Sequence, residues 1–348
     1  MSTNTITIGL DLGNTFNKAV GLDAEGKVLF RENLANKPDV MEEFFHKHAG
    51  VRVGMETGTH CRWISHLAVT CGCDTFVGDA RRLRLVFESS RKNDWNDALK
   101  IAEICRTSIA LFHPVHLRDQ EHHVLFQMLK ARNLLVAQRT QTVNELRGFC
   151  KSNACMLPKC DAKTLLSHLD GMPKDMRAQF RPLFVVLETL GRQIDAYDAK
   201  IEEYVRHHFA EEDRLLQTIP GIGPIASAAF IAHVPDPHAF RSARDAGPYF
   251  GLVPKQDQSG DKDAPCRITR EGSSFMRMLL VNSANYILRN GSAATPLQDF
   301  GRRIIGPGNG KVAKRKAKVA VARKLAVTML AMLRNRTEYR MPEHTESV

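Results

Sequence analysis

The sequence contains no long hydrophobic run, and this absence excludes one class of protein at once. No apolar stretch among its 348 residues approaches the roughly 20 residues that a membrane-spanning helix requires. The N-terminal "MSTNTITIGLDLG" also lacks the basic start and the apolar centre of a signal peptide. We therefore expect a cytoplasmic protein that has no membrane partner.

The sequence also lacks the spacing of a zinc site. Its eight cysteines include Cys71 and Cys73, which are too close together for a usual zinc site. A second group, Cys150, Cys155 and Cys160, has no partner cluster at ligand spacing. The metalloprotease spacing H-E-x-x-H is absent as well. We therefore expect reduced thiols.

Acidic residues are scarce in the C-terminal part, which leaves a large excess of positive charge there. The net charge is +11; residues 1–212 hold 28 basic and 27 acidic residues, whereas residues 213–348 hold 21 and 11. The densest basic run is "KVAKRKAKVAVARK", residues 311–324. Such a surface attracts polyanions and favours a nucleic acid as partner; the alternative is a merely solvated helix. The candidate phosphate contacts in this run are Lys311, Lys314, Arg315, Lys316 and Lys318.

The first 80 residues alternate between strand and helix patterns. Residues 4–12 place apolar side chains at every second position, which predicts a strand, and residues 17–33 predict a hairpin with "DAEG" at its turn. The next predicted elements are a helix over 39–49, a strand over 51–58, a helix over 60–72 and a strand over 73–79. This order is typical of an RNase H-like (RuvC-like) α/β domain, in which helices cover a mixed sheet.

Strand patterns disappear between about residues 110 and 212. Residues 121–147 predict a helix, and a heptad seam follows. The seam consists of Leu183, Leu187, Leu190, Ile194, Tyr197, Ile201, Tyr204 and His208. It predicts either a helix packed on its own domain or a coiled coil with another helix or subunit. After Asp213 a mainly helical unit begins. The expected domains are an α/β domain with flanking helices over 1–150, a coiled-coil region over 151–212 and a helical domain over 213–348.

Four acidic residues are expected to converge at one edge of the N-terminal sheet. The first predicted strand ends at Asp11 and the fourth at Glu56, and strand ends of this kind collect ligands. Asp94 and Asp97 lie three apart, which places them on one helix face. Clustered carboxylates repel one another unless cations lie between them, and Mg²⁺ prefers such oxygen ligands. We expect two Mg²⁺ ions, with Mn²⁺ as an alternative, in a site that acts on a phosphodiester.

"DLGNT", residues 11–15, supports a rival interpretation, because it also matches the first phosphate loop of sugar-kinase and actin-like ATPases. Those proteins need a second related sheet domain with its own Asp-Gly loop and a Gly-Gly adenosine pocket. Residues 110–348 are predicted to be helical and offer neither. The metal-site interpretation is therefore favoured.

Two C-terminal stretches are candidates for nucleic-acid contacts. "IPGIGPIASA", residues 219–228, resembles a helix-hairpin-helix turn in which Gly221 and Gly223 would let backbone N–H groups approach a phosphate; the alternative is a tight turn that binds no ligand. "PKQDQSGDKDAPCRITREG" is a polar loop. Lys255, Arg267 and Arg270 flank its Ser259, which by its chemistry alone is a turn residue, because no local base activates its hydroxyl.

Five stretches together carry a resemblance over almost the whole chain. They are "GLDLGNT", "GMETGTH", "RKNDWNDA", "IPGIGPIASA" and "YFGLVPKQDQSGDKDAPCRITREGSSFMRMLLV", in this order. The sequence closely resembles the DEDD-type transposases of the insertion sequence 110 family, relatives of the Piv-type DNA invertases. The resemblance implies a RuvC-like domain, a coiled-coil middle and a C-terminal transposase domain. It also implies double-stranded donor and target DNA as substrates, in the bacterial cytoplasm or nucleoid.

The resemblance assigns roles that the residues alone do not. It implies that Asp11, Glu56, Asp94 and Asp97 form the DEDD metal site, and that Ser259 attacks DNA and forms a covalent phosphoserine link. It implies a phosphate contact for Thr269. Its other implied partners are a non-coding bridge or seeker RNA from the element, whose loops pair with target and donor DNA, and further copies of the chain. Dimers would assemble to a tetramer, in which two subunits build a composite site.

Two alternatives to this function stay open. One is an invertase-like or resolvase-like nuclease that acts on DNA without a guide RNA. The other is a catalytically silent protein that only binds nucleic acid. The first alternative predicts that no discrete guide RNA purifies with the protein. The second predicts that the protein does not recombine DNA.

Overall fold

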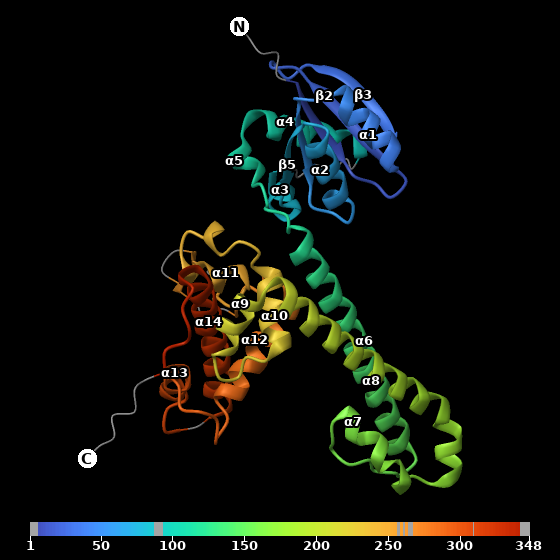
Figure 1. Cartoon of the computed structure of the whole chain (residues 1–348), viewed down its shortest axis with the longest axis vertical. Coiled ribbons are helices and arrows are strands. Elements are labelled where there is room, and N and C mark those ends of the chain that lie inside the picture. The colour runs from blue at the N-terminus through green and yellow to red at the C-terminus, as the bar shows by residue number, and fades with distance from the viewer. Residues whose placement is uncertain are drawn as a thin grey trace, which may run out of the picture. The chain divides into compact units, whose positions relative to one another are not determined.

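The computed structural model describes residues 6–86, 93–255, 258–259, 262–263, 267–308 and 310–341. The chain divides into two compact units, Met1–Leu117 and Arg118–Val348 (Figure 1). Within the described ranges, no helix is long and apolar enough to cross a membrane. The seven described cysteines are all free thiols, as expected for them. The three-part domain division expected from the sequence stays a prediction.

The first unit is built on a five-stranded mixed sheet. Its strands are β1 (Thr7–Asp11), β2 (Phe16–Leu22), β3 (Val28–Ala35), β4 (Arg52–Glu56) and β5 (Asp74–Gly78), in the spatial order β3-β2-β1-β4-β5. β1 pairs with β2 and β2 with β3 in antiparallel fashion, whereas β1, β4 and β5 are parallel. The predicted order of strands and helices is confirmed, and so is the mixed α/β class of this part of the chain.

Helices cover both faces of the sheet. The helices α1 (Pro38–Lys47) and α2 (Cys61–Thr70) form one core with the β1 side chains Ile8 and Leu10. On the opposite face, α4 (Asp94–Thr107) packs against Val20 and Leu22 of β2. The short helices α3 (Ala80–Val86) and α5 (Ile109–Phe112) contribute to a further cluster with α4. Side chains alternate between faces along each strand, so this division fixes which strand residues face α4.

Two adjacent glycines let α4 approach the sheet closely. Gly9 of β1 and Gly54 of β4 are register partners. A Cβ atom on Gly9 would lie 2.1 Å from the backbone oxygen of Ala98 in α4. A Cβ atom on Gly54 would lie 2.9 Å from the Cβ of Cys105 in the same helix. The absence of side chains at this pair therefore sets the position of α4 on β1 and β4.

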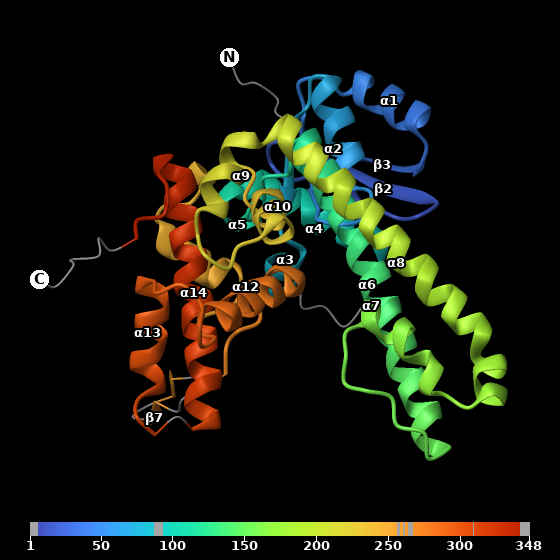
Figure 2. The same ribbon diagram turned by 60° about the horizontal axis from the view of Figure 1, so that its bottom comes forward.

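The second unit begins with two long antiparallel helices, α6 (Gln120–Ser152) and α8 (Lys174–His208), which run side by side in Figures 1 and 2. Near one end, the Tyr204 hydroxyl donates to the backbone oxygen of Glu121, 3.4 Å away. Near the other end, the rings of Phe149 and Phe180 stack with their centroids 5.2 Å apart. The short helix α7 (Ala162–Leu165) and the 3-10 helix Leu166–Gly171 lie in the connection.

The predicted heptad seam packs within this helix pair. Leu187, Ile194 and Ile201 are buried, and α6 is the main packing partner of α8. Arg132 of α6 forms a half-buried, two-bonded ion pair with Asp198 of α8. The seam therefore serves the chain's own fold, which was one of the two alternatives. A coiled-coil contact with another subunit stays a prediction.

The rest of the second unit is a helical domain with one large core. Its helices are α9 (Ala210–Gln217), α10 (Pro224–His233), α11 (Ala246–Tyr249), α12 (Ser274–Ile287), α13 (Pro296–Ile305) and α14 (Lys311–Asn335), with 3-10 turns at Pro237–Ala239 and Ala243–Asp245. The strands β6 (Gln258–Ser259) and β7 (Lys262–Asp263) pair in antiparallel fashion. α14 is buried along Val321, Leu325 and Met329, whereas its N-terminal half exposes the basic run. The expected mainly helical C-terminal part is confirmed.

Candidate functional site

Asp11 and Glu56 end neighbouring parallel strands at the same edge of the first unit's sheet. In the register of β1 and β4, each carboxylate follows the last paired residue. Asp11 shares the sheet face of Gly9, and Glu56 shares that of Gly54, because alternate residues point to the same side. Both glycines face α4. The two carboxylates therefore belong to the α4 face of this edge, which we call the acidic edge.

The direction of α4 brings its N-terminus to the acidic edge. The Lys18 Nζ lies 4.9 Å from the ring centroid of Trp95, near the start of α4, and Lys18 is the register partner of Asp11. Near the other end of the helix, the Arg106 guanidinium donates to the backbone oxygen of Ala24, 2.8 Å away, in the β2–β3 turn at the opposite edge of the sheet. The helix therefore runs antiparallel to β1, with its first turn at the acidic edge.

That first turn carries the other two predicted carboxylates. Asp94 is exposed and Asp97 is half-buried, and the Asn93 side chain caps the helix by accepting from the Trp95 backbone N–H, 3.0 Å away. The strand register and the direction of α4 therefore place all four acidic residues toward one edge of the sheet. Among the described residues, however, no three or more Asp, Glu, His or Cys side chains form a group that could hold a metal ion. The metal site itself stays a prediction.

Lys18 is a residue at the acidic edge that sequence reasoning did not identify. Its Nζ donates to Asn33 Oδ1, 2.7 Å away, in addition to its contact with the Trp95 ring. Its position opposite Asp11 follows from the register between β1 and β2, which the loop over residues 12–15 connects. The lysine adds one positive charge beside the predicted metal ligands.

Hydrogen bonds hold the two loops that follow β1 and β4. Buried Asn17 accepts from the Gly13 backbone N–H, 3.1 Å away, and Asn36 donates to the Gly13 oxygen, 2.9 Å away. The Asn14 side chain lies 3.4 Å from the His60 ring nitrogen Nε2. The "DLGNT" loop is therefore held by side chains of its own unit, which explains its polar sequence without a nucleotide.

In the second unit, Ser259 lies in the short strand β6, where it is the register partner of Lys262. Its side chain lies outside the described residues, so its environment stays a prediction. The two chain segments that lead to this hairpin are paired at its base. The Lys255 N–H donates to the Arg267 oxygen, 2.8 Å away, and the Thr269 N–H donates to the Val253 oxygen, 2.9 Å away.

The base of the hairpin is fixed by close backbone contacts. Gly251 and Gly272 have φ values of 64° and 72°, which favour glycine, and a Cβ on Gly251 would lie 2.3 Å from the Glu271 oxygen. The Arg277 guanidinium donates to the backbone oxygens of Phe250 and Glu271, at 2.9 and 2.8 Å. Burial lowers the pKa of Arg277, and the nearby Arg270 charge lowers it further. These contacts join the two arms of the hairpin base to α12.

A buried histidine supports the start of α12. His233 Nε2 lies 2.8 Å from Ser273 Oγ, and its Nδ1 lies 2.7 Å from the Ala229 backbone oxygen. Burial lowers the pKa of His233 to about 4, so its ring is neutral at neutral pH. Nδ1 then donates to the carbonyl and Nε2 accepts from the serine, while Ser273 Oγ also accepts from the Met276 N–H. The pair caps a helix, and no sequence motif indicated it.

A cationic groove lies between the hairpin base and the N-terminal half of α14. Its volume is about 970 Å³. We call it the hairpin groove; its cationic lining is Arg244, Arg267, Arg270, Arg315, Lys316, Arg323 and Lys324. Its apolar lining includes Leu252, Ile268, Val319 and Phe300, and no acidic residue is among its described lining. The groove thus combines four of the predicted phosphate contacts, from two segments distant in sequence, with unbalanced positive charge.

The other predicted contacts lie elsewhere in this unit. Lys255 is exposed at the hairpin base, and Lys311 is exposed at the first position of α14. Lys314 and Lys318 line a different groove, beside α13. The Thr269 hydroxyl oxygen is buried and has no hydrogen-bond partner among the described residues. The basic run is therefore divided between two surfaces.

The predicted helix-hairpin-helix turn joins α9 to α10. Gly221 has a φ of 97°, and a Cβ there would lie 2.9 Å from the Tyr286 ring, so packing on α12 alone accounts for this glycine. Gly223 is the N-cap residue of α10, and a Cβ there would meet no atom within 4 Å. Both glycines line a hollow of about 460 Å³. A phosphate contact at this turn stays a prediction.

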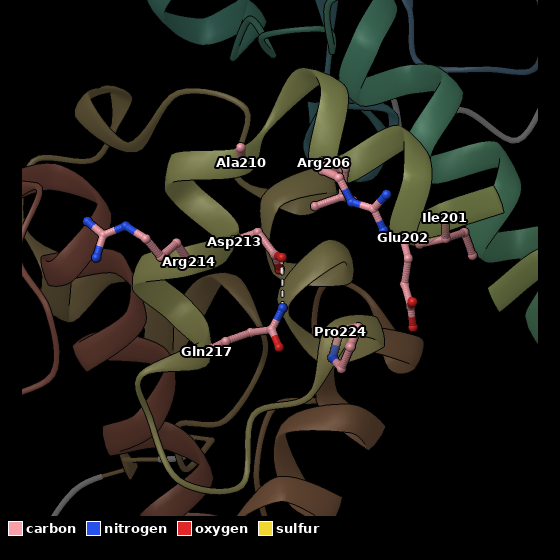
Figure 3. Close-up of a pocket in the computed structure, with 9 residues that line it drawn as sticks. Ile201, Glu202, Arg206, Ala210, Asp213, Arg214, Gln217 and Pro224 are labelled. Carbon is pink, nitrogen blue, oxygen red and sulfur yellow. Dashed lines mark hydrogen bonds between the residues drawn. The ribbon is translucent and has the colours of Figure 1, made fainter. Parts of the chain in front are cut away.

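A further hollow of this unit differs in charge from the hairpin groove. Figure 3 shows its lining, where Gln217 Nε2 donates to Asp213 Oδ2 across 2.7 Å. Glu202 and two arginines also line it, and its volume is about 260 Å³. Acidic and basic side chains are mixed here, so the hollow lacks the positive excess that a nucleic acid requires.

Comparisons with known proteins agree with these features. A family model described as "Transposase", for the DEDD transposases of the IS110 group, matches residues 8–152. A second, described as "Transposase IS116/IS110/IS902 family", matches residues 213–296. The first span contains all four residues of the acidic edge, and the second contains the Ser259 hairpin.

Relatives match over nearly the full chain. The chain is 25% identical over 347 residues to the "Transposase for insertion sequence element IS1111A" of Coxiella burnetii, covering 96% of this chain and 91% of that protein. It is 28% identical over 349 residues to a "Probable family 20 transposase" of Pseudomonas aeruginosa, covering 97% and 99%. It is 26% identical over 332 residues to the "Transposase for insertion sequence element IS1328" of Yersinia enterocolitica, covering 93% and 95%.

These matches define the class first: the protein is an enzyme of mobile DNA that cleaves and rejoins DNA strands. Within this class, the chain belongs to the IS110 family of insertion-sequence transposases. The resemblance drawn from the five sequence stretches is thereby confirmed, and so is the prediction of a DNA transposase.

Proposed function

We propose that this transposase is an RNA-guided recombinase that combines a DEDD metal site with a serine nucleophile. The proposal is supported chiefly by the placement of four carboxylates toward the acidic edge, in a chain that also carries a cationic groove at the base of the Ser259 hairpin. The strand order β3-β2-β1-β4-β5, with three parallel strands and an antiparallel hairpin, is compatible with the RNase H-like fold that we propose for this unit.

The acidic edge suits a divalent metal by its donor chemistry. Its four predicted ligands are carboxylates, which are the hard oxygen donors that Mg²⁺ and Mn²⁺ prefer. Asp11, Glu56, Asp94 and Asp97 would hold the metal, as a pair of Mg²⁺ ions with Mn²⁺ as the alternative. When bound, it would neutralise charge on the scissile phosphate. The strand ends would orient Asp11 and Glu56, and the first turn of α4 would orient Asp94 and Asp97.

Ser259 is the proposed nucleophile. Its Oγ loses its proton and forms a bond to the phosphorus of the scissile phosphodiester, while the bond from phosphorus to the leaving strand oxygen breaks and that oxygen takes up a proton. The resulting phosphoserine ester keeps the number of phosphoester bonds constant. Attack by the hydroxyl end of another strand then reverses the step and joins donor to target without an external energy source.

The proposed partners follow from the family resemblance. Guide RNA from the element pairs with donor and target DNA, so the protein contacts helix shape and backbone rather than base sequence. The hairpin groove would bind the backbone of the DNA strand beside Ser259. A tetramer built from dimers would join the acidic edge of one subunit to the serine hairpin of another. The proposed three domains, 1–150, 151–212 and 213–348, correspond to these roles.

The alternative function is recombination without a guide RNA. The test is to purify the full-length protein from cells that carry its element and to sequence the RNA that remains bound. A discrete RNA encoded beside the gene is the expected result. If recombination is active with protein freed of RNA, the guide-independent alternative holds instead.

A mixing experiment tests the composite site. Asp11→Ala and Ser259→Ala variants should each be inactive in recombination and should each retain RNA binding. Their mixture should recover part of the activity, because one subunit supplies the acidic edge and the other the serine. Full recombination by either single variant would refute the role assigned to the residue that it replaces. Full recombination by both variants would show that other residues carry out the reaction.

A further inference from the structure

A second cationic groove lies on α14, and we call it the α13 groove. Its lining is Asn285, Leu288, Arg289, Asn290, Arg302, Ile305, Gly306, Lys314 and Lys318, and its volume is about 690 Å³. These residues come from the C-terminal ends of α12 and α13, the turns that follow them, and the first two turns of α14. α12 and α13 each pack closely against α14, and all three helices can be followed in Figure 2.

The two grooves use different sides of the same helix. Successive residues of an α-helix are turned by about 100°. Lys314 and Lys318, one turn apart, therefore share one side of α14. Lys316 is turned by roughly 160° from Lys318, and it lines the hairpin groove. The basic run that looked like a single charged stretch in the sequence thus supplies two separate surfaces.

The chemistry of the α13 groove favours a phosphodiester backbone. Four of its nine lining residues are Lys or Arg, two are Asn, and none of the described lining is acidic. Amides and cations both donate hydrogen bonds to phosphate oxygens. Its apolar side chains are limited to Leu288 and Ile305, whereas the hairpin groove has a larger apolar lining. An anionic backbone is therefore a better match than an unstacked base or an apolar peptide.

We propose that the α13 groove binds the backbone of a second nucleic-acid segment, distinct from the strand held in the hairpin groove. This proposal deepens the proposed function and rests on it for the identity of the first segment. One helical domain would then hold two polyanions on opposite sides of α14, with only one of them beside the Ser259 hairpin. Such an arrangement keeps two segments close together while α14 separates their backbones.

The test uses matched pairs of exposed cations in the full-length protein. Arg302→Gln with Lys314→Gln removes charge from the α13 groove, and Arg270→Gln with Lys316→Gln removes it from the hairpin groove. Arg181→Gln with Lys200→Gln, on exposed positions of α8, is the control. Each protein is titrated with a labelled DNA duplex, with a labelled RNA hairpin of equal length, and with each probe after saturation by the other.

The expected result is that the two groove variants weaken different binding steps. Each should lose about tenfold or more affinity for one probe, and the dependence of log K on log salt should become shallower by about 2 for that step, one unit for each lost phosphate contact. The control should change neither step. Because the hairpin groove is proposed to bind DNA, the Arg302/Lys314 variant should lose affinity for the RNA hairpin.

Two results would overturn the inference. The Arg302/Lys314 variant could behave like the Arg181/Lys200 control, or both groove variants could weaken the same single step to the same extent. Because these titrations measure binding without strand cleavage, they stand apart from the proposed chemistry. If the protein binds both probes as expected but forms no bond between Ser259 and DNA, only the proposed function is refuted. The inference about the α13 groove would then stand.

Discussion

The sites proposed for the two units of the chain would be built in opposite ways. At the acidic edge, four carboxylates come from two strand ends and one helical turn, and the close fit of α4 on Gly9 and Gly54 sets their positions. In the second unit, cations from a hairpin base and a long helix line broad grooves. A metal site requires ligand positions accurate to a few tenths of an ångström, whereas phosphate contacts through long side chains tolerate more variation.

The largest predicted effect is on strand cleavage and comes from a change at the acidic edge. Asp11→Asn should reduce strand cleavage at least about 100-fold, the equivalent of roughly 3 kcal/mol in the barrier, because a metal ligand is lost. Its DNA affinity should stay within about twofold, because no phosphate contact is removed. Binding by anisotropy and cleavage of labelled DNA measure the two quantities on the same preparation.

The Arg270→Gln/Lys316→Gln variant is the counterpart on the basic side. It should lose DNA affinity and recover most of its cleavage when DNA is saturating. Equal loss of affinity in the Asp11 variant would contradict the division of labour between the two units.

The next effect concerns how the acidic edge is built. Gly9→Ala should destabilise the first unit by about 3 kcal/mol, because the added Cβ would lie 2.1 Å from the Ala98 oxygen and α4 would have to move. Gly58→Ala is the matched control, since a Cβ there meets no atom within 4 Å. Urea unfolding compares the two. A Gly9→Ala protein as stable as the Gly58→Ala protein would show that α4 does not need this close contact.

A pH effect is expected from the second unit. His233 has its pKa lowered to about 4 from 6.5, so the unfolded chain binds its proton more readily than the folded one. Its contribution to stability is therefore complete above about pH 6.5 and is lost as the pH falls toward 4. Between pH 7 and 5 the loss should be about 2 kcal/mol. In urea unfolding, His233→Gln should remove that part of the pH dependence; an unchanged slope would contradict the buried neutral ring.

The smallest predicted effect lies at Lys18. Its positive charge beside the acidic edge opposes a divalent cation, so Lys18→Met should tighten Mg²⁺ or Mn²⁺ binding by about threefold, which corresponds to less than 1 kcal/mol. Lys27→Met, an exposed lysine of the β2–β3 turn, is the control. Calorimetric titration of both variants with the metal measures the difference. Identical affinities would place Lys18 outside the site.

Much of the first unit was predictable, because its elements are short and strongly patterned. Alternating apolar residues gave the strands, and ligand sites at strand ends made Asp11 and Glu56 candidates. The approach of α4 was not predictable, since the role of Gly9 depends on contact with Ala98, 89 positions later. Lys18 escaped notice because its place opposite Asp11 depends on the register between β1 and β2.

The second unit was predictable in helical content but less so in its surfaces. The heptad seam of α8 indicated a packed helix, but a repeat within one helix does not identify its partner, which is α6 of the same chain. The basic run predicted positive charge, yet its division between two grooves depends on how α12 and α13 pack on α14. Buried His233 belongs to no motif, so only its contacts with Ala229 and Ser273 define its role.

The proposed chemistry requires Ser259 to form a covalent bond to DNA under the control of the acidic edge. The direct measurement is to incubate the protein with labelled recombination-site DNA, denature the mixture and identify the modified residue by mass spectrometry. The expected result is a DNA–protein adduct at Ser259 that is absent in Ser259→Ala and Asp11→Asn and is retained in Ser274→Ala, a matched exposed serine at the start of α12. An adduct that persists in Ser259→Ala, or strand exchange with no adduct at all, would contradict it.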